Sequence, residues 1–282
     1  MPKFFITQNQ IREEKIILIG EDVKHIANVL RKQVGDIINI CNIDTSENFL
    51  CQLEKIEKEE ISCKIIEKIK SESEPNTKLT IFQGLPKAEK MELIIQKCTE
   101  LGAETFVPVD MERCIVKLDD KQASKKIERW QKIAETAAKQ SGRDVIPKVE
   151  NLINLKKLCN LIKKYDIVLL AYENEENYSL KEAVNSIKNK ENLQIGVIIG
   201  PEGGIDEKEI EILSEAGAKL ITLGKRNNYL ELEVNPDCVQ YAGVVENNNG
   251  QLNITYLPAS PFFSRVDKKH DCWDCKKHGH CW

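Results

Sequence analysis

From residue 79 onward, short and continuously apolar runs alternate with stretches of helical spacing, and this alternation limits the possible folds more than any other feature. The apolar runs are LTIFQGL, TFVPVD, DIVLLAYE, QIGVIIG and AKLITLG. Apolar residues recur at helical spacing over 87–101, 124–141, 180–188 and 206–216. Strands that are apolar on both faces and alternate with helices form a parallel sheet covered on both sides. The sequence therefore predicts an α/β domain.

The first seventy or so residues follow a different pattern. Brief β-branched segments, KFFIT, KIILI, DIINICN, FLCQLEKIE and ISCKIIEKI, are separated by polar turns, with one helical interruption over 21–32. The segment SESEPNTK (71–78) is polar, contains a proline and lacks apolar periodicity, as linkers do. We expect a small β-barrel-like domain over 1–72, the α/β domain over 73–250, and an atypical Cys/His-rich tail over 251–282.

Length and composition favour a cytoplasmic protein of two domains. A chain of 282 residues with 41% hydrophobic residues can bury a full core, and domains average roughly 150 residues. No stretch approaches the roughly 18 apolar residues of a membrane span, and the start of the chain has no long apolar run. Seven scattered cysteines are typical of reduced core thiols: Cys41, Cys51, Cys63, Cys98, Cys114, Cys159 and Cys238.

The formal net charge of −4 argues against binding nucleic acid through bulk charge. Residues 112–148 nevertheless contain ten Lys or Arg against six acids. This segment has a local charge of +4 and can supply a basic face.

The segment VIIGPEGGIDEKEI (197–210) carries the most chemical information. An apolar strand runs directly into GPEGG (200–204), and Asp206 then caps a helix. Gly203 and Gly204 permit backbone torsions and a close approach that side chains prevent. Ligands bind outside the carboxyl ends of the strands in open α/β sheets, where this corner lies. A tight turn without a ligand is the alternative. No G-x-G-x-x-G follows a strand and no G-K-[ST] follows these glycines, so a dinucleotide or a triphosphate does not fit.

Three motifs in order, HIANVLRKQVGD (25–36), ERWQKIAETAAKQSGRDVIPKVE (128–150) and IGPEGGIDEKEIE (199–211) with LGKR downstream, point to one family. They resemble motifs of the SPOUT methyltransferases that modify N3 of a uridine in 16S ribosomal RNA. The similar region covers roughly residues 1–226. The resemblance implies a PUA-like, RNA-binding β-barrel, an α/β domain with a trefoil knot, S-adenosylmethionine as cofactor, 16S rRNA or the 30S subunit as partner, and a homodimer.

The resemblance also implies site residues. The cofactor would lie against Leu170, Ala171, Tyr172, Glu173, Ile199, Gly200, Pro201, Glu202, Gly203, Gly204, Leu223 and Gly224. Methyl transfer needs alignment above all because the sulfonium is already activated. A cation or base should assist, since uracil N3 carries a proton; the catalytic candidates are Arg143, Arg226 and Glu231. An ordinary salt bridge is the alternative for each arginine. RNA contacts are expected from His25, Arg31, Lys32, Arg113 and Arg129, although a structural histidine or solvated charges would look alike.

The chain departs from the family pattern after Arg226. The family continues with ILRxETA, where this chain reads NNYLELEVNPD. Glu231 falls on the expected glutamate, but Pro236 would disrupt a helix. Genuine divergence and a frame disturbance both account for this segment. If the last helix is malformed, cofactor binding is weak or absent. Two further functions therefore stay open: an RNA-binding protein of this fold without methyl transfer, and a SPOUT enzyme acting on transfer RNA.

The last residues, HDCWDCKKHGHCW, lie outside the family pattern. Thiolate and imidazole ligands are those of tetrahedral zinc sites. The candidate ligands are Cys272, Cys275, His278 and Cys281. A disordered tail without metal is the alternative.

Overall fold

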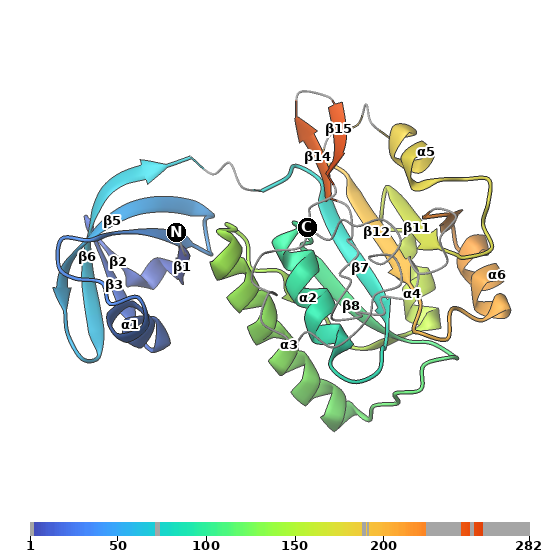
Figure 1. The fold of residues 1–282 in the computed structure, drawn as a ribbon, viewed down its shortest axis with the longest axis horizontal. Helices are drawn as coiled ribbons and strands as arrows, with labels where there is room; N and C mark the ends of the chain where they lie inside the picture. Colours follow the sequence, from blue (N-terminus) through green and yellow to red (C-terminus); the bar gives the residue numbers. More distant parts are fainter. Residues whose placement is uncertain are drawn as a thin grey trace, which may run out of the picture.

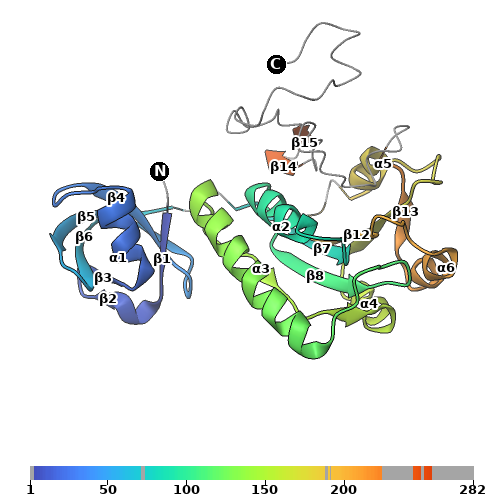
Figure 2. The ribbon, with the colours of Figure 1, turned by 60° about the horizontal axis from the view of Figure 1, so that its bottom comes forward.

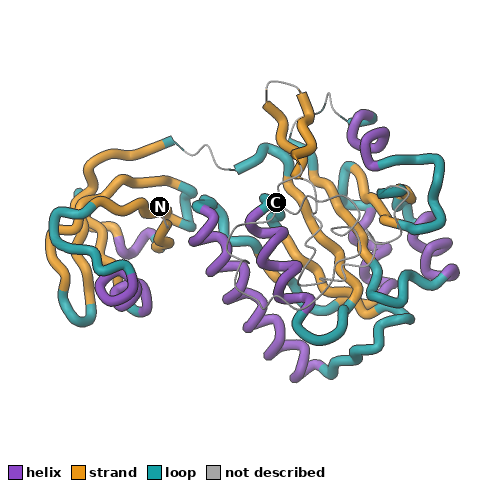
Figure 3. Tube along the Cα trace, in the orientation of Figure 1, coloured by secondary structure: helices purple, strands orange, loops and turns teal. Residues whose placement is uncertain are grey.

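The computed structural model describes residues 3–70, 74–187, 190 and 192–223, together with the backbone of two short strands at 244–248 and 251–255. The described chain forms two sheets that lie side by side, with the long helix α3 (Asp120–Ser141) between them (Figures 1 and 2). Figure 3 shows that strands dominate the amino-terminal part, whereas helices and strands alternate in the rest. Both observations agree with the predicted change of pattern.

The amino-terminal sheet has six strands in the order β1-β4-β5-β6-β3-β2. Only the β1–β4 pair is parallel within this sheet. Buried and exposed side chains alternate along β3, so that Ile16 and Leu18 join the core with Phe4, Ile40 and Ile61. The strands are β1 (Lys3–Ile6), β2 (Ile11–Arg12), β3 (Lys15–Ile19), β4 (Ile37–Asn42), β5 (Glu47–Ile56) and β6 (Glu60–Ile69). The predicted β-rich fold is confirmed; β2, with two residues, is too short to show alternation.

Short helical segments complete this half of the chain. The turn η1 (Gln8–Gln10) precedes β2, and α1 (Glu21–Lys24) continues into the π-helical turn η2 (His25–Val29). The last two form the helical interruption predicted over 21–32. Val23 and Ile26 from these turns are buried in the core of the sheet.

The second sheet is entirely parallel, in the order β10-β8-β7-β12-β11-β13, and β9 pairs with β8. Its strands are β7 (Lys78–Gly84), β8 (Thr105–Asp110), β9 (Lys148–Val149), β10 (Ile153–Asn154), β11 (Ile167–Ala171), β12 (Gln194–Ile199) and β13 (Lys219–Ile221). The prediction of a parallel sheet is confirmed. A separate antiparallel hairpin consists of β14 (Val244–Asn248) and β15 (Gln251–Thr255).

Helices cover both faces of the parallel sheet. Val168 and Leu170 of β11 pack in the large core with α4 and α6, whereas Ile167 and Leu169 of the same strand pack with α5. This arrangement explains why the strand is continuously apolar. The helices are α2 (Lys90–Glu100), α3, α4 (Leu155–Ile162), α5 (Leu180–Asn185) and α6 (Glu207–Glu215). No helix in the described ranges is long and apolar enough to cross a membrane.

Local signals explain where the helices begin and end. The α3 helix starts at Asp120, four residues before the predicted start, because the Asp119 side chain accepts a hydrogen bond from Gln122 N–H and Gln122 returns one in a capping box. It ends at Gly142, which has a positive φ of 73°. The α4 helix was not predicted, although Asn154 caps it by accepting from Lys157 N–H at 3.0 Å.

Side chains of α3 and of the loop after it join the two sheets. Lys3 of β1 forms an ion pair with Asp144, and Lys139 Nζ lies 3.0 Å from the Asp22 carboxylate. Phe5, Cys41 and Ala138 form a small apolar cluster. In Figure 2 the carboxyl end of α3 accordingly lies beside β1. Polar and apolar contacts together fix the amino-terminal sheet against the α/β half.

Candidate active site

The corner over residues 200–204 lies at the carboxyl edge of the parallel sheet, against the end of β7. Gln83 Nε2 donates to the carbonyl of Gly200 at 3.0 Å. A Cβ on Gly84 would lie only 2.7 Å from Cδ of Pro201, so glycine is needed for this close approach. Gln83 is 2% exposed, and its Oε1 is buried without a hydrogen-bond partner in the described part of the chain. This end of β7 therefore forms one wall of the corner.

The Glu202 side chain ties the corner to the loop between β7 and α2. Its Oε1 accepts from Lys87 N–H at 2.9 Å and lies 3.2 Å from Lys90 Nζ. Burial acts to raise the pKa of Glu202, but these hydrogen bonds and the ammonium of Lys90 outweigh it and lower the pKa. The carboxylate is thus engaged within the chain, and a cofactor contact by this residue would use its main chain.

The loop after β8 holds the other side of the corner. Arg113 Nη1 donates to the carbonyl of Gly203 at 3.2 Å, and Nη2 lies 3.4 Å from the Asp206 carboxylate. Asp206 caps α6, as predicted, by accepting from Lys208 N–H at 3.1 Å. Arg113, which is predicted to contact RNA, therefore lies against the corner over residues 200–204.

Glu209 on the first turn of α6 is the most unusual acid near this corner. It is 7% exposed, and its Oε1 accepts from Glu112 N–H at 3.0 Å. Its Oε2 is buried without a hydrogen-bond partner among the described residues. Burial raises the pKa of this carboxyl above its usual range, although hydrogen bonds from the backbone oppose the shift. Ionisation of Glu209 is therefore less favourable than that of an exposed glutamate.

The three predicted cofactor segments are neighbours at this edge. Ala171 at the end of β11 pairs with Ile221 at the end of β13, and Tyr172 N–H donates to the Ile221 carbonyl at 3.1 Å. A Cβ on Gly204 would lie 3.8 Å from Oε1 of Glu173. The structure thus brings together residues 170–173, 199–204 and Leu223. Gly224 lies outside the described residues.

The catalytic candidates do not gather at this edge. Arg143 is 4% exposed and donates to the carbonyls of Thr99 and Ala103, which precede β8, and to Glu74, which precedes β7. It therefore lies at the amino edge of the sheet with its guanidinium engaged, which counts against the catalytic role predicted for it. Arg226 and Glu231 lie outside the described residues, so their roles stay predictions.

The predicted RNA contacts in the amino-terminal half lie around η2. The His25 ring packs edge-on against Phe4 with the centroids 6.0 Å apart, as a structural histidine would. Arg31 is exposed in a left-handed conformation with φ 51°. Lys32 is half-buried, and its Nζ lies 3.9 Å from the Asp36 carboxylate.

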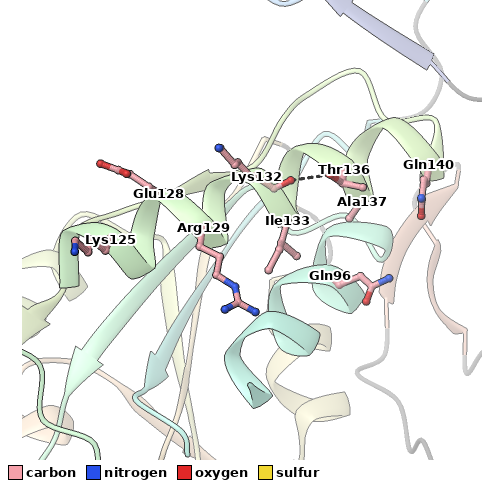
Figure 4. Close-up of a pocket in the computed structure, with 9 residues that line it drawn as sticks. All are labelled: Gln96, Lys125, Glu128, Arg129, Lys132, Ile133, Thr136, Ala137 and Gln140. Atoms are coloured by element: carbon pink, nitrogen blue, oxygen red, sulfur yellow. Dashed lines mark hydrogen bonds between the residues drawn. The ribbon is translucent and has the colours of Figure 1, made fainter. Parts of the chain in front are cut away.

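Arg129, the remaining RNA candidate, lies in a groove of about 690 Å³ between α2 and α3 (Figure 4). Its guanidinium lies 2.8 Å from Glu92 and 3.6 Å from Glu89, so it bridges the two helices. Lys125 and Lys132 line the same groove around Ile133. An RNA contact by Arg129 would have to compete with these carboxylates.

Sequence reasoning missed Gln83, Lys87 and Lys90, which contact residues of the corner, and Glu112, which donates to Glu209 beside it. Gln83 lies in the predicted strand LTIFQGL, Lys87 and Lys90 lie in the first turns of the helix predicted after it, and Glu112 closely follows the predicted strand TFVPVD. Since the carboxyl ends of parallel strands share one edge, that rule could have identified these loops.

Within residues 3–70, 74–187, 190 and 192–223, no group of three His, Cys, Asp or Glu side chains could hold a metal ion. The zinc ligands predicted at Cys272, Cys275, His278 and Cys281 lie outside those ranges.

Two family models match the chain. Residues 72–227, more than half of the sequence, match the model of the RNA methyltransferase domain, and residues 18–66 match that of the RNA methyltransferase PUA domain. The first match ends one residue beyond Arg226, where the sequence departs from the motif pattern.

Curated proteins and solved structures agree with these models. Ribosomal RNA small subunit methyltransferase E of Bacillus subtilis is 40% identical over 231 residues, which cover 80% of this chain and 90% of that protein. The structure of a ribosomal RNA small subunit methyltransferase E from Neisseria gonorrhoeae bound to S-adenosyl methionine has a TM-score of 0.71 at 28% identity and covers 82% of this chain and 93% of that chain. A putative methyltransferase from Legionella pneumophila, in complex with the same cofactor, has a TM-score of 0.68 at 26% identity, with coverage of 79% and 89%. This chain therefore belongs to the family of ribosomal RNA small subunit methyltransferase E.

Proposed function

We propose that this protein transfers the methyl group of S-adenosylmethionine to N3 of a uridine in 16S ribosomal RNA. The observation that carries the proposal is the glycine corner at the carboxyl edge of the sheet, in a chain that belongs to this family. The relative from Neisseria gonorrhoeae binds S-adenosyl methionine and has the same fold over 82% of this chain.

The residues at the corner fit this cofactor. Gly204 has a φ of 71°, which an L residue rarely adopts, and a Cβ at this position would point between the side chains of Glu173 and Arg113. The main-chain groups of residues 170–173, 199–204 and 223 would hold the adenine and the methionine moiety. When bound, the sulfonium supplies an already activated methyl group.

The chain's own contribution would be alignment and charge stabilisation. Hydrogen bonds of Gln83, Glu202 and Arg113 hold the corner against the neighbouring loops in the absence of ligand. A site ordered in advance reduces the entropy lost on reaction. Arg226 and Glu231 remain our candidates for stabilising charge on the uracil and accepting the N3 proton.

The remaining features of the proposal follow the family. We place the RNA-binding barrel at 1–72, the SPOUT domain with its trefoil knot at 73–250 and the tail at 251–282. The substrate would be 16S rRNA or the 30S subunit, bound by a cytoplasmic homodimer. Arg31, which is exposed, and Lys32, which is half-buried, are our candidates on the barrel for contacting phosphates.

One observation favours a second function, an RNA-binding protein of this fold without methyl transfer. The match to the RNA methyltransferase domain ends at residue 227, so the segment that would complete the cofactor pocket is not matched.

Single-turnover methylation tests these functions. The protein is mixed with tritium-labelled S-adenosylmethionine and, in parallel, with unmodified 16S rRNA, 30S subunits or transfer RNA, and the RNA is digested to nucleosides. We expect label in 3-methyluridine from 16S rRNA or 30S subunits. RNA binding without transfer of label would support the second function. Label in transfer RNA alone would contradict the proposal that 16S ribosomal RNA is the substrate.

A further inference from the structure

The bare Cα of Gly204 lies between two side chains of opposite charge. A Cβ built on this residue would lie 3.8 Å from Oε1 of Glu173 and 3.9 Å from Nη1 of Arg113. No other described atom beyond the adjacent residues comes within 4 Å of that position. The carboxylate comes from the loop after β11 and the guanidinium from the loop after β8. An open position between two charges is thus built from distant parts of the sequence.

Both charged groups can accept a further partner. Glu173 is exposed and forms no hydrogen bond or ion pair within the described part of the chain. Arg113 is 44% exposed at its side chain and uses two of its nitrogens, at 3.2 Å and 3.4 Å, on Gly203 and Asp206. A guanidinium has five N–H donors, so donors remain for a ligand.

The two groups do not neutralise each other directly, because no ion pair links them in the described chain. A ligand with an ammonium and a carboxylate on one carbon would satisfy both, since the ammonium pairs with Glu173 and the carboxylate with Arg113. An RNA phosphate would gain from Arg113 but would be repelled by Glu173. The pattern therefore selects a zwitterion over a simple anion.

We propose that Glu173 and Arg113 form a subsite for the α-amino-acid end of a zwitterionic ligand. This inference rests on the proposed function, under which that end is the methionine moiety of S-adenosylmethionine. Gly204 leaves the space that the moiety fills, and the contacts of Arg113 with Gly203 and Asp206 hold the guanidinium in place. Arg113 is then a cofactor-binding residue.

The test compares three ligands by calorimetry on the full chain. S-adenosylmethionine carries both charges, decarboxylated S-adenosylmethionine lacks the carboxylate, and 5′-methylthioadenosine lacks the whole amino-acid end. The wild-type protein should bind the intact cofactor about tenfold more tightly than the decarboxylated form, as one charge-assisted pair implies. In Arg113→Gln that preference should fall to about one. Glu173→Gln should weaken binding of both ammonium-bearing ligands by a similar factor and leave 5′-methylthioadenosine unchanged.

Matched controls and the remaining outcomes keep the test decisive. Lys117→Gln removes an exposed cation from the same loop as Arg113, and Glu176→Gln removes an exposed acid from the same loop as Glu173; both should keep the wild-type ratios. A wild-type protein without preference for the carboxylate, or an Arg113→Gln variant that weakens all three ligands equally, would overturn the subsite alone. A wild-type protein that binds none of the three would instead overturn the proposed function.

Discussion

The carboxylate of Glu74 and the guanidinium of Arg143 form a two-point ion pair, with nitrogen–oxygen distances of 2.6 and 3.3 Å. Glu74 Oε1 also accepts from Asp144 N–H at 2.7 Å. The Arg143 side chain is 5% exposed. Since Glu74 lies in the segment that joins the two sheets and Arg143 follows α3, this pair fixes the connecting segment to the α/β half.

Replacing Arg143 with alanine should destabilise the fold. The change removes the cation that pairs with the Glu74 carboxylate and one donor from each of the Thr99 and Ala103 carbonyls, at a cost of about 3 kcal/mol. Urea unfolding followed by circular dichroism, with an unchanged m-value, measures this loss. Lys148→Gln is the control, because it removes an exposed ion pair with Glu150 and should cost under about 1 kcal/mol. Equal losses in the two variants would contradict the prediction.

Replacing Glu209 with glutamine should change how stability depends on pH. Because burial raises the folded-state pKa of this carboxyl above its value of 4.5 in the unfolded chain, the folded protein binds the proton more tightly. The free energy of unfolding of the wild-type protein therefore falls relative to that of Glu209→Gln as pH rises from 4.5 through the raised pKa. Below pH 4.5 this loss of stability is absent.

Replacing Glu182 with glutamine should change the pH dependence of stability in the opposite direction. Hydrogen bonds from Ser179 lower the pKa of Glu182, so its stabilising effect is present above the unfolded pKa and is lost as pH falls through the folded pKa. Urea unfolding at a series of pH values from about pH 3 to about pH 8, a range that brackets the ordinary glutamate pKa of about 4.3, checks both directions. Parallel curves for the wild type and Glu209→Gln would show that the carboxyl is not perturbed.

Alanine at Gly204 should cost stability, whereas alanine at Gly203 should not. Gly204 has a φ of 71°, and an L residue in that region costs about 1–2 kcal/mol. A Cβ on Gly203 would have its nearest contact at 3.5 Å, with Cβ of Arg113, which is ordinary packing. Thermal unfolding of the two variants measures the difference. Equal melting temperatures would mean that the left-handed corner does not form in solution.

The buried thiols should resist alkylation in the folded protein. Burial raises the pKa of the Cys51, Cys63 and Cys98 thiols to about 12 and that of Cys41 to about 11, and the thiolate is the reactive form. Cys159 is partly exposed and should react first among the described cysteines. Mass spectrometry after iodoacetamide treatment at pH 8 reads each site, with urea-unfolded protein as the fully labelled control. Native labelling of Cys51 ahead of Cys159 would refute the prediction.

Most of the fold followed from periodicity, and the failures have physical reasons. Apolar runs such as LTIFQGL predict buried parallel strands because both faces must be covered. The short strands β9 and β10 contain two residues each, too few for any pattern. The α4 helix follows them immediately, so its apolar positions could not be separated from loop residues.

The site was predictable only in part. The glycine corner is visible in the sequence because Gly203 and Gly204 follow an apolar strand. The position of Arg143 at the opposite edge depends on its long-range contacts with Ala103 and Glu74, which no local pattern encodes. Arg113 belongs to the corner for the same reason, since its contact with Gly203 spans 90 positions of the sequence.

Two ion pairs, between Lys3 and Asp144 and between Asp22 and Lys139, join the barrel to α3 and the loop after it. They hold the barrel at a set distance from the glycine corner. Under the proposed function, the barrel would bind the RNA and the glycine corner would hold the cofactor. An RNA could then contact both surfaces only if its folded shape places the target uridine and the barrel-binding segment at that distance. Target choice would depend on the three-dimensional structure of the ribosomal RNA more than on the bases beside the uridine.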